Sequence, residues 1–212
     1  MKILSIDTTS ETGSIAFLED EEIRHELTFN IPDMAGKLAG YTEKILADNG
    51  CRASELGLIV VSRGPGQWTG IRLGMGFAKG IACGGKADIY CIDTAGNVFS
   101  AIRNFRIPAL CLVNAYRQRM HVSVFNGRFN PAKIYPVRTV THERLFELCK
   151  KKKVFLTGPG TAVIPEEIRR LKNVTPAARH LLVPTAGNGA ILALERIKKN
   201  VPSLPLEPFY GK

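Results

Sequence analysis

Residues 58–83 read LIVVSRGPGQWTGIRLGMGFAKGIAC and hold the features that decide the fold. Residues 58–61 form a continuous apolar run, which is typical of a strand buried on both faces of a sheet. A turn rich in glycine and proline follows at residues 62–69, and a helix is expected from about residue 70 to residue 83. With another apolar strand at residues 89–92, this order predicts a β-α-β crossover between parallel strands.

The N-terminal side adds three short strands at residues 2–6, 14–18 and 22–29, which we expect to form an antiparallel meander. A helix is predicted at residues 33–49, because apolar residues recur there at helical spacing and Gly50 is placed to end it. The order β-β-β-α-β-α-β gives a mixed sheet with helices packed on it. This is the ribonuclease-H-like arrangement of an α/β protein.

A second β-rich region follows Asn104. Its expected elements are strands at residues 109–113, 121–125 and 154–157 and helices at residues 143–151 and 189–199. The tail PSLPLEPFYGK is rich in proline and is expected to run extended over the surface. We therefore divide the chain into an N-terminal lobe of residues 1–103 and a smaller C-terminal lobe of residues 104–212.

The composition is that of a globular protein with a strong positive charge. The chain has 212 residues, of which 45% are hydrophobic and 23% are charged, and its net charge is +10. Such a charge favours attraction to a polyanion or to an acidic partner protein, although solubility alone would also account for it.

Neither a membrane segment nor a disulfide framework is expected. No apolar run approaches the roughly 18 residues that a membrane span requires, and the first ten residues lack the long apolar stretch of a signal peptide. The five cysteines are odd in number and widely spaced, without a C-x-x-C pair. We therefore expect a cytoplasmic protein with reduced cysteines and no metal site built from them.

The turn after the first strand, IDTTSETGS at residues 6–14, is rich in hydroxyl groups. Such a turn can offer backbone N–H groups and hydroxyls to a phosphate, so Asp7, Thr8 and Thr9 are candidates for a phosphate turn that is now vestigial. The same residue types form ordinary hairpin turns. The turn alone does not separate these two interpretations.

Small residues form two stripes along the predicted helix at residues 70–83. Gly70, Gly74 and Ala78 lie four apart, and so do Gly76, Gly80 and Gly84. Each internal glycine costs a helix roughly 1 kcal/mol relative to alanine. Several together need a compensating close approach of another element, which belongs either to the same chain or to a partner.

The opening IDTTSETGS, the segment VVSRGPGQWTGIRLGMGFAKGIA, the later LVNAYRQRMHVSVF and the closing LPLEPFYGK resemble, in order and spacing, the TsaB (YeaZ) family. The resemblance implies the actin-like and sugar-kinase (ASKHA) fold, with a reduced second lobe. It also implies a non-catalytic subunit without a cofactor that pairs with its paralogue TsaD and works with the ATPase TsaE. Together they transfer a threonylcarbamoyl group to adenosine 37 of tRNAs that read ANN codons, so tRNA is a partner through the complex.

Catalytic residues are not expected. A metal-assisted transferase of the TsaD type needs paired histidines at helical spacing, and the four histidines of this chain are far apart in sequence. The chain also lacks G-x-S-x-G and H-E-x-x-H. The main alternative is a stand-alone actin-fold ATPase or small-molecule kinase, whose second phosphate loop would be the GPG turn at residues 158–160. A plain RNA-binding protein is a third interpretation, but the usual RNA-binding motifs are missing.

The resemblance places the partner surface on the first lobe, on the helices at residues 33–49 and 70–84. Its candidate contacts are Met34, Leu38, Tyr41 and Met75. An aromatic side chain suits an interface core, which favours Tyr41 most, whereas Leu38 and Met75 would also fit the chain's own core. Because a surface that fits a paralogue is roughly self-complementary, the chain alone is expected to form homodimers as well.

Overall fold

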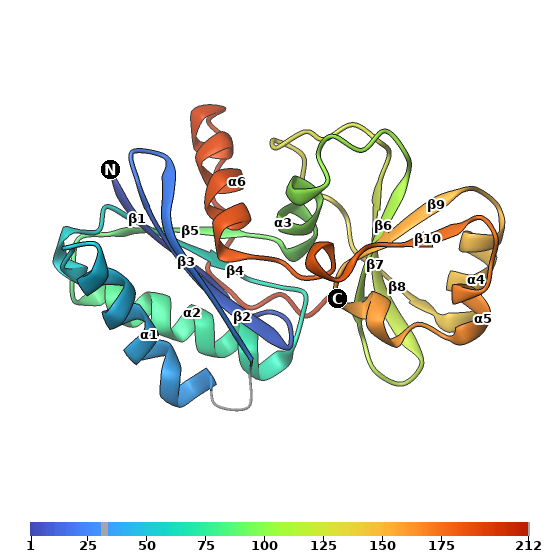
Figure 1. Ribbon diagram of the computed structural model, residues 1–212, viewed down its shortest axis with the longest axis horizontal. Coiled ribbons are helices and arrows are strands. Elements are labelled where there is room, and N and C mark those ends of the chain that lie inside the picture. The colour runs from blue at the N-terminus through green and yellow to red at the C-terminus, as the bar shows by residue number, and fades with distance from the viewer. Residues whose placement is uncertain (31–33, 212) are drawn as a thin grey trace.

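The structure, a computed structural model, describes residues 1–30 and 34–211, without the side chains of Met34, Ala35 and Arg179. Over these residues the chain forms two five-stranded sheets side by side, each with helices packed on it (Figure 1). The strand order is β3-β2-β1-β4-β5 in the first sheet and β10-β9-β6-β7-β8 in the second. None of the described helices is long and apolar enough to cross a bilayer.

The first sheet is a meander joined to a parallel crossover. Its strands are β1 (Lys2–Asp7), β2 (Thr12–Glu19), β3 (Glu22–Asn30), β4 (Leu58–Ser62) and β5 (Asp88–Ile92). β1, β2 and β3 pair antiparallel, whereas β4 pairs parallel with both β1 and β5. The expected order of strands and helices in this half is confirmed.

Helices cover both faces of the first sheet. These helices are α1 (Met34–Asp48) and α2 (Trp68–Cys83) on one face and α6 (Ala186–Lys198) on the other (Figure 1). Successive side chains of β1 point to opposite faces of the sheet, which explains the two layers. Leu4 and Ile6 pack toward α1 and α2, while Ile3 packs toward α6. The helix predicted at residues 33–49 is therefore present from residue 34, and Asp33 lies outside the described residues.

The second sheet has shorter edge strands than the first. It contains β6 (Ala109–Asn114), β7 (Arg119–Phe125), β8 (Arg138–Thr141), β9 (Val154–Thr157) and β10 (Val174–Pro176), with α4 (His142–Lys150) and α5 (Glu166–Arg169). The sequence did not predict β8, β10 or α5. These are elements of three or four residues, too short to show a hydrophobic period.

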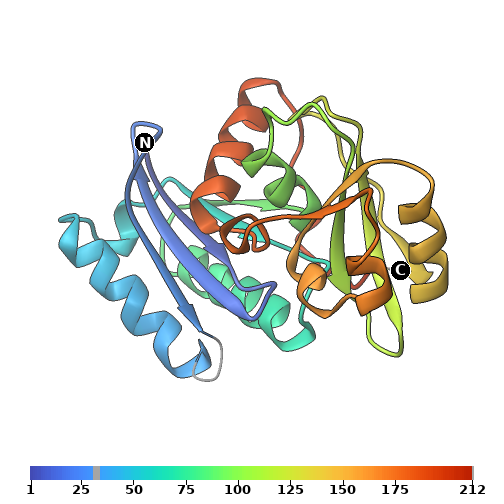
Figure 2. The ribbon, with the colours of Figure 1, turned by 45° about the vertical axis from the view of Figure 1, so that its right-hand side comes forward.

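The C-terminal part of the chain returns to the first lobe. α6 packs on the first sheet and lies beside α3 (Thr94–Ala101), as Figure 2 shows. Arg196 of α6 is buried and donates through Nη2 to Asp93 Oδ2 at 2.9 Å, at the start of α3. The division after residue 103 separates the strands of the two sheets, and as a division into lobes it stays a proposal. By its packing, α6 is part of the first lobe.

The tail after α6 connects both sheets. The Tyr90 hydroxyl donates to the Val201 carbonyl at 2.8 Å, so the start of the tail is held against β5. Further along, Tyr210 stacks on Trp68 at 3.9 Å between ring centroids. The Thr139 hydroxyl of β8 then donates to the Gly211 carbonyl at 3.2 Å. The tail therefore runs along the surface, as expected, and contacts both lobes.

Candidate partner interface

The β1–β2 turn holds a buried carboxylate that is used inside the chain. Asp7 Oδ1 accepts from the backbone N–H of Thr9 at 3.0 Å and from its hydroxyl at 2.8 Å. Asp7 Oδ2 accepts from the Ser62 hydroxyl and from Asn97 Nδ2, the latter at 2.9 Å. Burial raises the pKa of the Asp7 carboxyl above its ordinary value, while these donors lower it. The carboxylate therefore joins β1, β4 and α3.

The start of α2 closes over the same turn. The Thr8 hydroxyl donates to the Gly70 carbonyl at 2.7 Å, and a Cβ atom on Gly70 would lie 2.0 Å from the Thr8 carbonyl oxygen. A Cβ atom on Gly66 would lie 2.1 Å from the carbonyl oxygen of Thr9. The side chains of Asp7, Thr8 and Thr9 are thus occupied by contacts within the chain. Their role as a vestigial phosphate turn stays a prediction.

A cleft of about 280 Å³ lies between the lobes. It is lined by the β1–β2 turn on one side and by the 3-10 helix Pro159–Val163 on the other. Among the residues whose side chains the structure describes, its lining contains one carboxylate, Glu11, and no lysine or arginine. Ligand pockets usually measure roughly 300–1,000 Å³, and a polyphosphate needs cationic or metal partners. The volume lies at the lower end of this range, and the charge of the described lining disfavours a nucleoside triphosphate.

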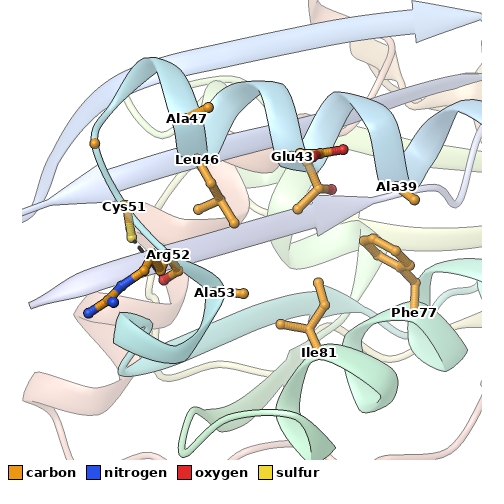
Figure 3. A pocket seen from close by; sticks show the side chains of 11 residues that line it. Ala39, Glu43, Leu46, Ala47, Cys51, Arg52, Ala53, Phe77 and Ile81 are labelled. Carbon is orange, nitrogen blue, oxygen red and sulfur yellow. Dashed lines mark hydrogen bonds between the residues drawn. The ribbon is translucent and has the colours of Figure 1, made fainter.

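An apolar groove of about 610 Å³ separates α1 from α2 on the outer face of the first lobe (Figure 3). Ala39, Leu46 and Ala47 line it from α1, and Phe77 and Ile81 line it from α2. Among the described residues of the lining, only Glu43 and Arg52 are charged. This composition fits contact with another protein surface better than contact with a charged ligand.

The groove continues over the outer side of α2. A second hollow of about 490 Å³ shares Phe77 and Ile81 with it and also includes Gly76 and Gly80. A Cβ atom on either glycine would meet nothing within 4 Å. We call these two hollows together the α1–α2 face. Another helix could approach closely here, because the two glycines present no side chain.

Comparisons with known proteins find similarity to two kinds of protein, described as TsaD and TsaB. A family model described as TsaD: tRNA N6-adenosine threonylcarbamoyltransferase matches residues 34–133. The proteins named tRNA threonylcarbamoyladenosine biosynthesis protein TsaB of Escherichia coli and Haemophilus influenzae are each 25% identical to the chain. The alignment with the E. coli protein covers 70% of this chain and 68% of that protein. The alignment with the H. influenzae protein covers 99% of this chain and 93% of that protein. The chain is similar to the TsaB (YeaZ) family over most of its length.

Solved structures place this chain in the ASKHA fold. YeaZ from Pseudomonas aeruginosa matches 99% of each chain with a TM-score of 0.79 at 19% identity. The ethanolamine utilization protein EutJ from Carboxydothermus hydrogenoformans matches 91% of this chain and 90% of EutJ with a TM-score of 0.53 at 13% identity. The expected actin-like, ribonuclease-H-like architecture is confirmed, and at these identities the likeness concerns the fold alone.

The predicted contacts of the TsaB-family partner surface fall in different places. Leu38 and Met75 are only 1% and 2% exposed and lie in the core between the first sheet and its helices. Tyr41 is half-buried, with its ring centroid 5.0 Å from that of Phe29 on β3. The side chain of Met34 lies outside the described residues. Leu38 and Met75 therefore have almost no surface left for a partner, and Tyr41 keeps some.

Two partly buried residues that line the groove, Phe77 and Ile81, were not predicted as contacts. Helical spacing shows which residues share a face, but it does not show which face is covered by the chain itself. The stripe of Gly76 and Gly80 was the available signal, since Phe77 and Ile81 each follow one of these glycines. Within the described residues, no group of three or more His, Cys, Asp or Glu side chains could hold a metal ion.

Proposed function

We propose that this chain acts in tRNA threonylcarbamoyladenosine biosynthesis as a non-catalytic subunit that pairs with a TsaD-type catalytic paralogue. The support is the name carried by its TsaB relatives and the match of residues 34–133 to the TsaD family model. We place the pair, with a TsaE-type ATPase, in the transfer of threonylcarbamoyl to adenosine 37 of tRNAs that read ANN codons. This substrate puts the reaction in the cytoplasm.

The observation that carries the proposal is the α1–α2 face. It is open and apolar, and both of its helices lie within the segment that is similar to TsaD. Two paralogues that share these helices can pair through equivalent faces, because such a contact is approximately isologous. The same argument allows a homodimer of this chain when the partner is absent.

The non-catalytic role is supported by the chemistry of the turn and the cleft. Asp7 is buried and fully engaged, and the cleft between the lobes offers one carboxylate and no cation among the side chains that the structure describes. A stand-alone ATPase or kinase would need groups for the phosphates and for Mg²⁺ there. Calorimetry of the purified chain with ATP and Mg²⁺ should therefore give no binding heat, and a clear isotherm would favour the ATPase alternative.

The pairing is tested by filling the α1–α2 face. In the double variant Gly76→Lys, Gly80→Lys, the new Cβ atoms meet nothing in the chain within 4 Å. We expect the chain to gain roughly 0.5–1 kcal/mol of helix stability per substitution, because lysine is the better helix former. We also expect pairing with the TsaD-type subunit to weaken by about 100-fold, since the close approach is blocked.

The matched control is Gly76→Ala, Gly80→Ala, which gives the same helix gain with far less bulk. Thermal melting of each variant and size-exclusion chromatography with the TsaD-type subunit of the same organism provide the readouts. We expect the alanine variant to retain most of the pairing. A lysine variant that melts above the parent and still co-elutes fully with the partner would contradict the proposed surface.

A further inference from the structure

A third hollow, of about 840 Å³, lies on the side of the first sheet that α6 covers. Its lining residues come from the C-terminal end of α6 and from the loops that follow α3 and β7. The charged residues of its lining are Arg103, Arg106, Arg128, Glu195, Lys198 and Lys199. We call this region the basic hollow.

The basic hollow concentrates positive charge from three distant parts of the chain. Its lining carries five cations and one carboxylate, a net charge of +4 out of the +10 of the whole chain. The carboxylate, Glu195, is already paired with Arg103. The Arg103 guanidinium also lies 5.0 Å from the centroid of the Phe129 ring. Arg103 is therefore held in place, and the remaining cations have no carboxylate of the hollow to neutralise them.

Three of these cations are available for a ligand. Arg106, Arg128 and Lys199 are exposed, and none of them makes an ion pair with a carboxylate in the described part of the chain. Lys198 differs, because it pairs with Glu21. A lysine at the end of α6 is favourable for the helix dipole in any case. That account does not extend to Arg106 and Arg128, which lie in loops outside any helix.

We propose that the basic hollow binds the phosphodiester backbone of RNA. Arginine suits phosphate because its planar guanidinium donates two parallel hydrogen bonds, and Arg106 and Arg128 converge with Lys199 around one concavity. A concave surface can admit an RNA strand, whereas a flat anionic membrane would contact only the rim of the hollow. The identification of that RNA as tRNA rests on the proposed function.

The position of the basic hollow is compatible with pairing. α6 and the α1–α2 face lie on opposite sides of the first sheet (Figure 1). A partner bound to the α1–α2 face therefore leaves the basic hollow open. The chain would then contribute directly to holding the RNA, in addition to contacting the catalytic subunit.

The test compares two sets of three neutralised cations. The first variant is Arg106→Gln, Arg128→Gln, Lys199→Gln. The matched control is Lys151→Gln, Lys152→Gln, Lys153→Gln, which removes the same charge from exposed lysines that follow α4. Fluorescence anisotropy with a labelled tRNA transcript is measured over a series of salt concentrations, for the chain alone and for its complex with the TsaD-type subunit.

For the first variant we expect the affinity for tRNA at a fixed salt concentration to fall by about tenfold or more. The plot of log affinity against log salt has a negative slope, and its magnitude should become smaller by about two to three. This is roughly one for each phosphate that the protein no longer neutralises. The control should change much less in both quantities. An equal change in the control, or unchanged affinity in the first variant, would overturn the proposal. The proposal would also be overturned if neither the parent chain nor its complex bound tRNA.

Two further measurements separate this proposal from its alternatives. Size-exclusion chromatography reports pairing with the TsaD-type subunit, which the first variant should retain. If the parent chain fails to pair, the proposed function fails, but tRNA binding by the chain alone still tests the basic hollow. Vesicles containing an anionic lipid serve as the third probe, and binding to these vesicles in preference to tRNA would overturn the RNA assignment.

Discussion

Helix α2 carries two stripes of glycine that look alike in the sequence and differ in what lies beside them. Gly70 and Gly74 face the β1–β2 turn. A Cβ atom on Gly70 would lie 2.0 Å from the Thr8 carbonyl oxygen, and a Cβ atom on Gly74 would lie 2.2 Å from the Thr8 hydroxyl oxygen. Gly76 and Gly80 face outward, where a Cβ atom would meet nothing within 4 Å. The first pair is required by the fold of the chain, and the second pair is not.

The difference shows where the cost of each glycine is compensated. An internal glycine lowers helix stability by roughly 1 kcal/mol relative to alanine. At Gly70 and Gly74, close packing against Thr8 offsets this cost within the chain. At Gly76 and Gly80 no contact within the chain offsets it, which agrees with our proposal that a partner helix approaches there.

The largest effect is expected from adding one methyl group at Gly70, which packs against the β1–β2 turn. Gly70→Ala should lower the free energy of unfolding by about 3 kcal/mol or more, because the backbone of α2 or of the turn must shift to relieve the overlap with Thr8. The matched variant Gly76→Ala should raise the same free energy by up to about 1 kcal/mol. Urea denaturation of both variants measures the difference, and equal effects of the two substitutions would remove the distinction between the stripes.

The next effect concerns the carboxylate that holds the turn beneath α2. Asp7→Ala would leave the buried donors of Ser62, Thr9 and Asn97 without their acceptor, which should lower the free energy of unfolding by about 3 kcal/mol. Modification of tRNA by the reconstituted complex should persist at temperatures where the variant is folded. A variant that melts like the parent but abolishes activity would instead indicate a working phosphate site.

The pH dependence of stability follows from the same carboxyl. Burial raises the pKa of folded Asp7 above its ordinary value of 3.8, so the folded state holds the proton more strongly than the unfolded state does. The contribution of Asp7 to the free energy of unfolding therefore decreases as the pH rises from about 3.8 through the raised pKa, and is constant above it. Asp7→Asn cannot ionise and should lack this decrease, as urea denaturation between pH 4 and pH 7 would show.

Much of the first lobe could be predicted from the sequence, because its pattern is strong. The buried run at residues 58–61 and the apolar spacing of α1 and α2 leave few alternatives for the sheet order. The position of α6 could not be predicted, since an apolar helix face does not indicate which sheet covers it. The ion pair between Arg196 and Asp93 joins positions 103 residues apart, and nothing local in the sequence points to it.

The candidate site was predicted only at the level of helices. Leu38 and Met75 were expected on the partner surface from their spacing, and that spacing is equally that of a core face. Phe77 was not predicted as a contact, although it stands next to Gly76. Whether a small or apolar residue faces the chain or its surroundings depends on the neighbouring elements, such as the turn that Thr8 forms, and not on the helix that carries it.

The smallest effect is expected at Tyr41, on the edge of the proposed surface. Tyr41 shares a helix side with the buried residues Leu38 and Ile45, whereas Ala39 and Glu43 line the groove from another side of α1. Its ring packs on Phe29, so part of its surface belongs to the fold. Tyr41→Asp should therefore lower the free energy of unfolding by about 1 kcal/mol, because the aromatic pair is removed.

The same variant should weaken pairing with the TsaD-type subunit by about tenfold, because a carboxylate at the rim remains partly hydrated. This is less than the effect of lysine at Gly76 and Gly80, whose side chains would stand in the centre of the α1–α2 face. Tyr41→Phe, which keeps the ring, is the control and should change neither quantity much. If Tyr41→Asp abolished pairing while the double lysine variant paired normally, the contact would lie on the β3 side of α1, and the open stripe of α2 would need another explanation.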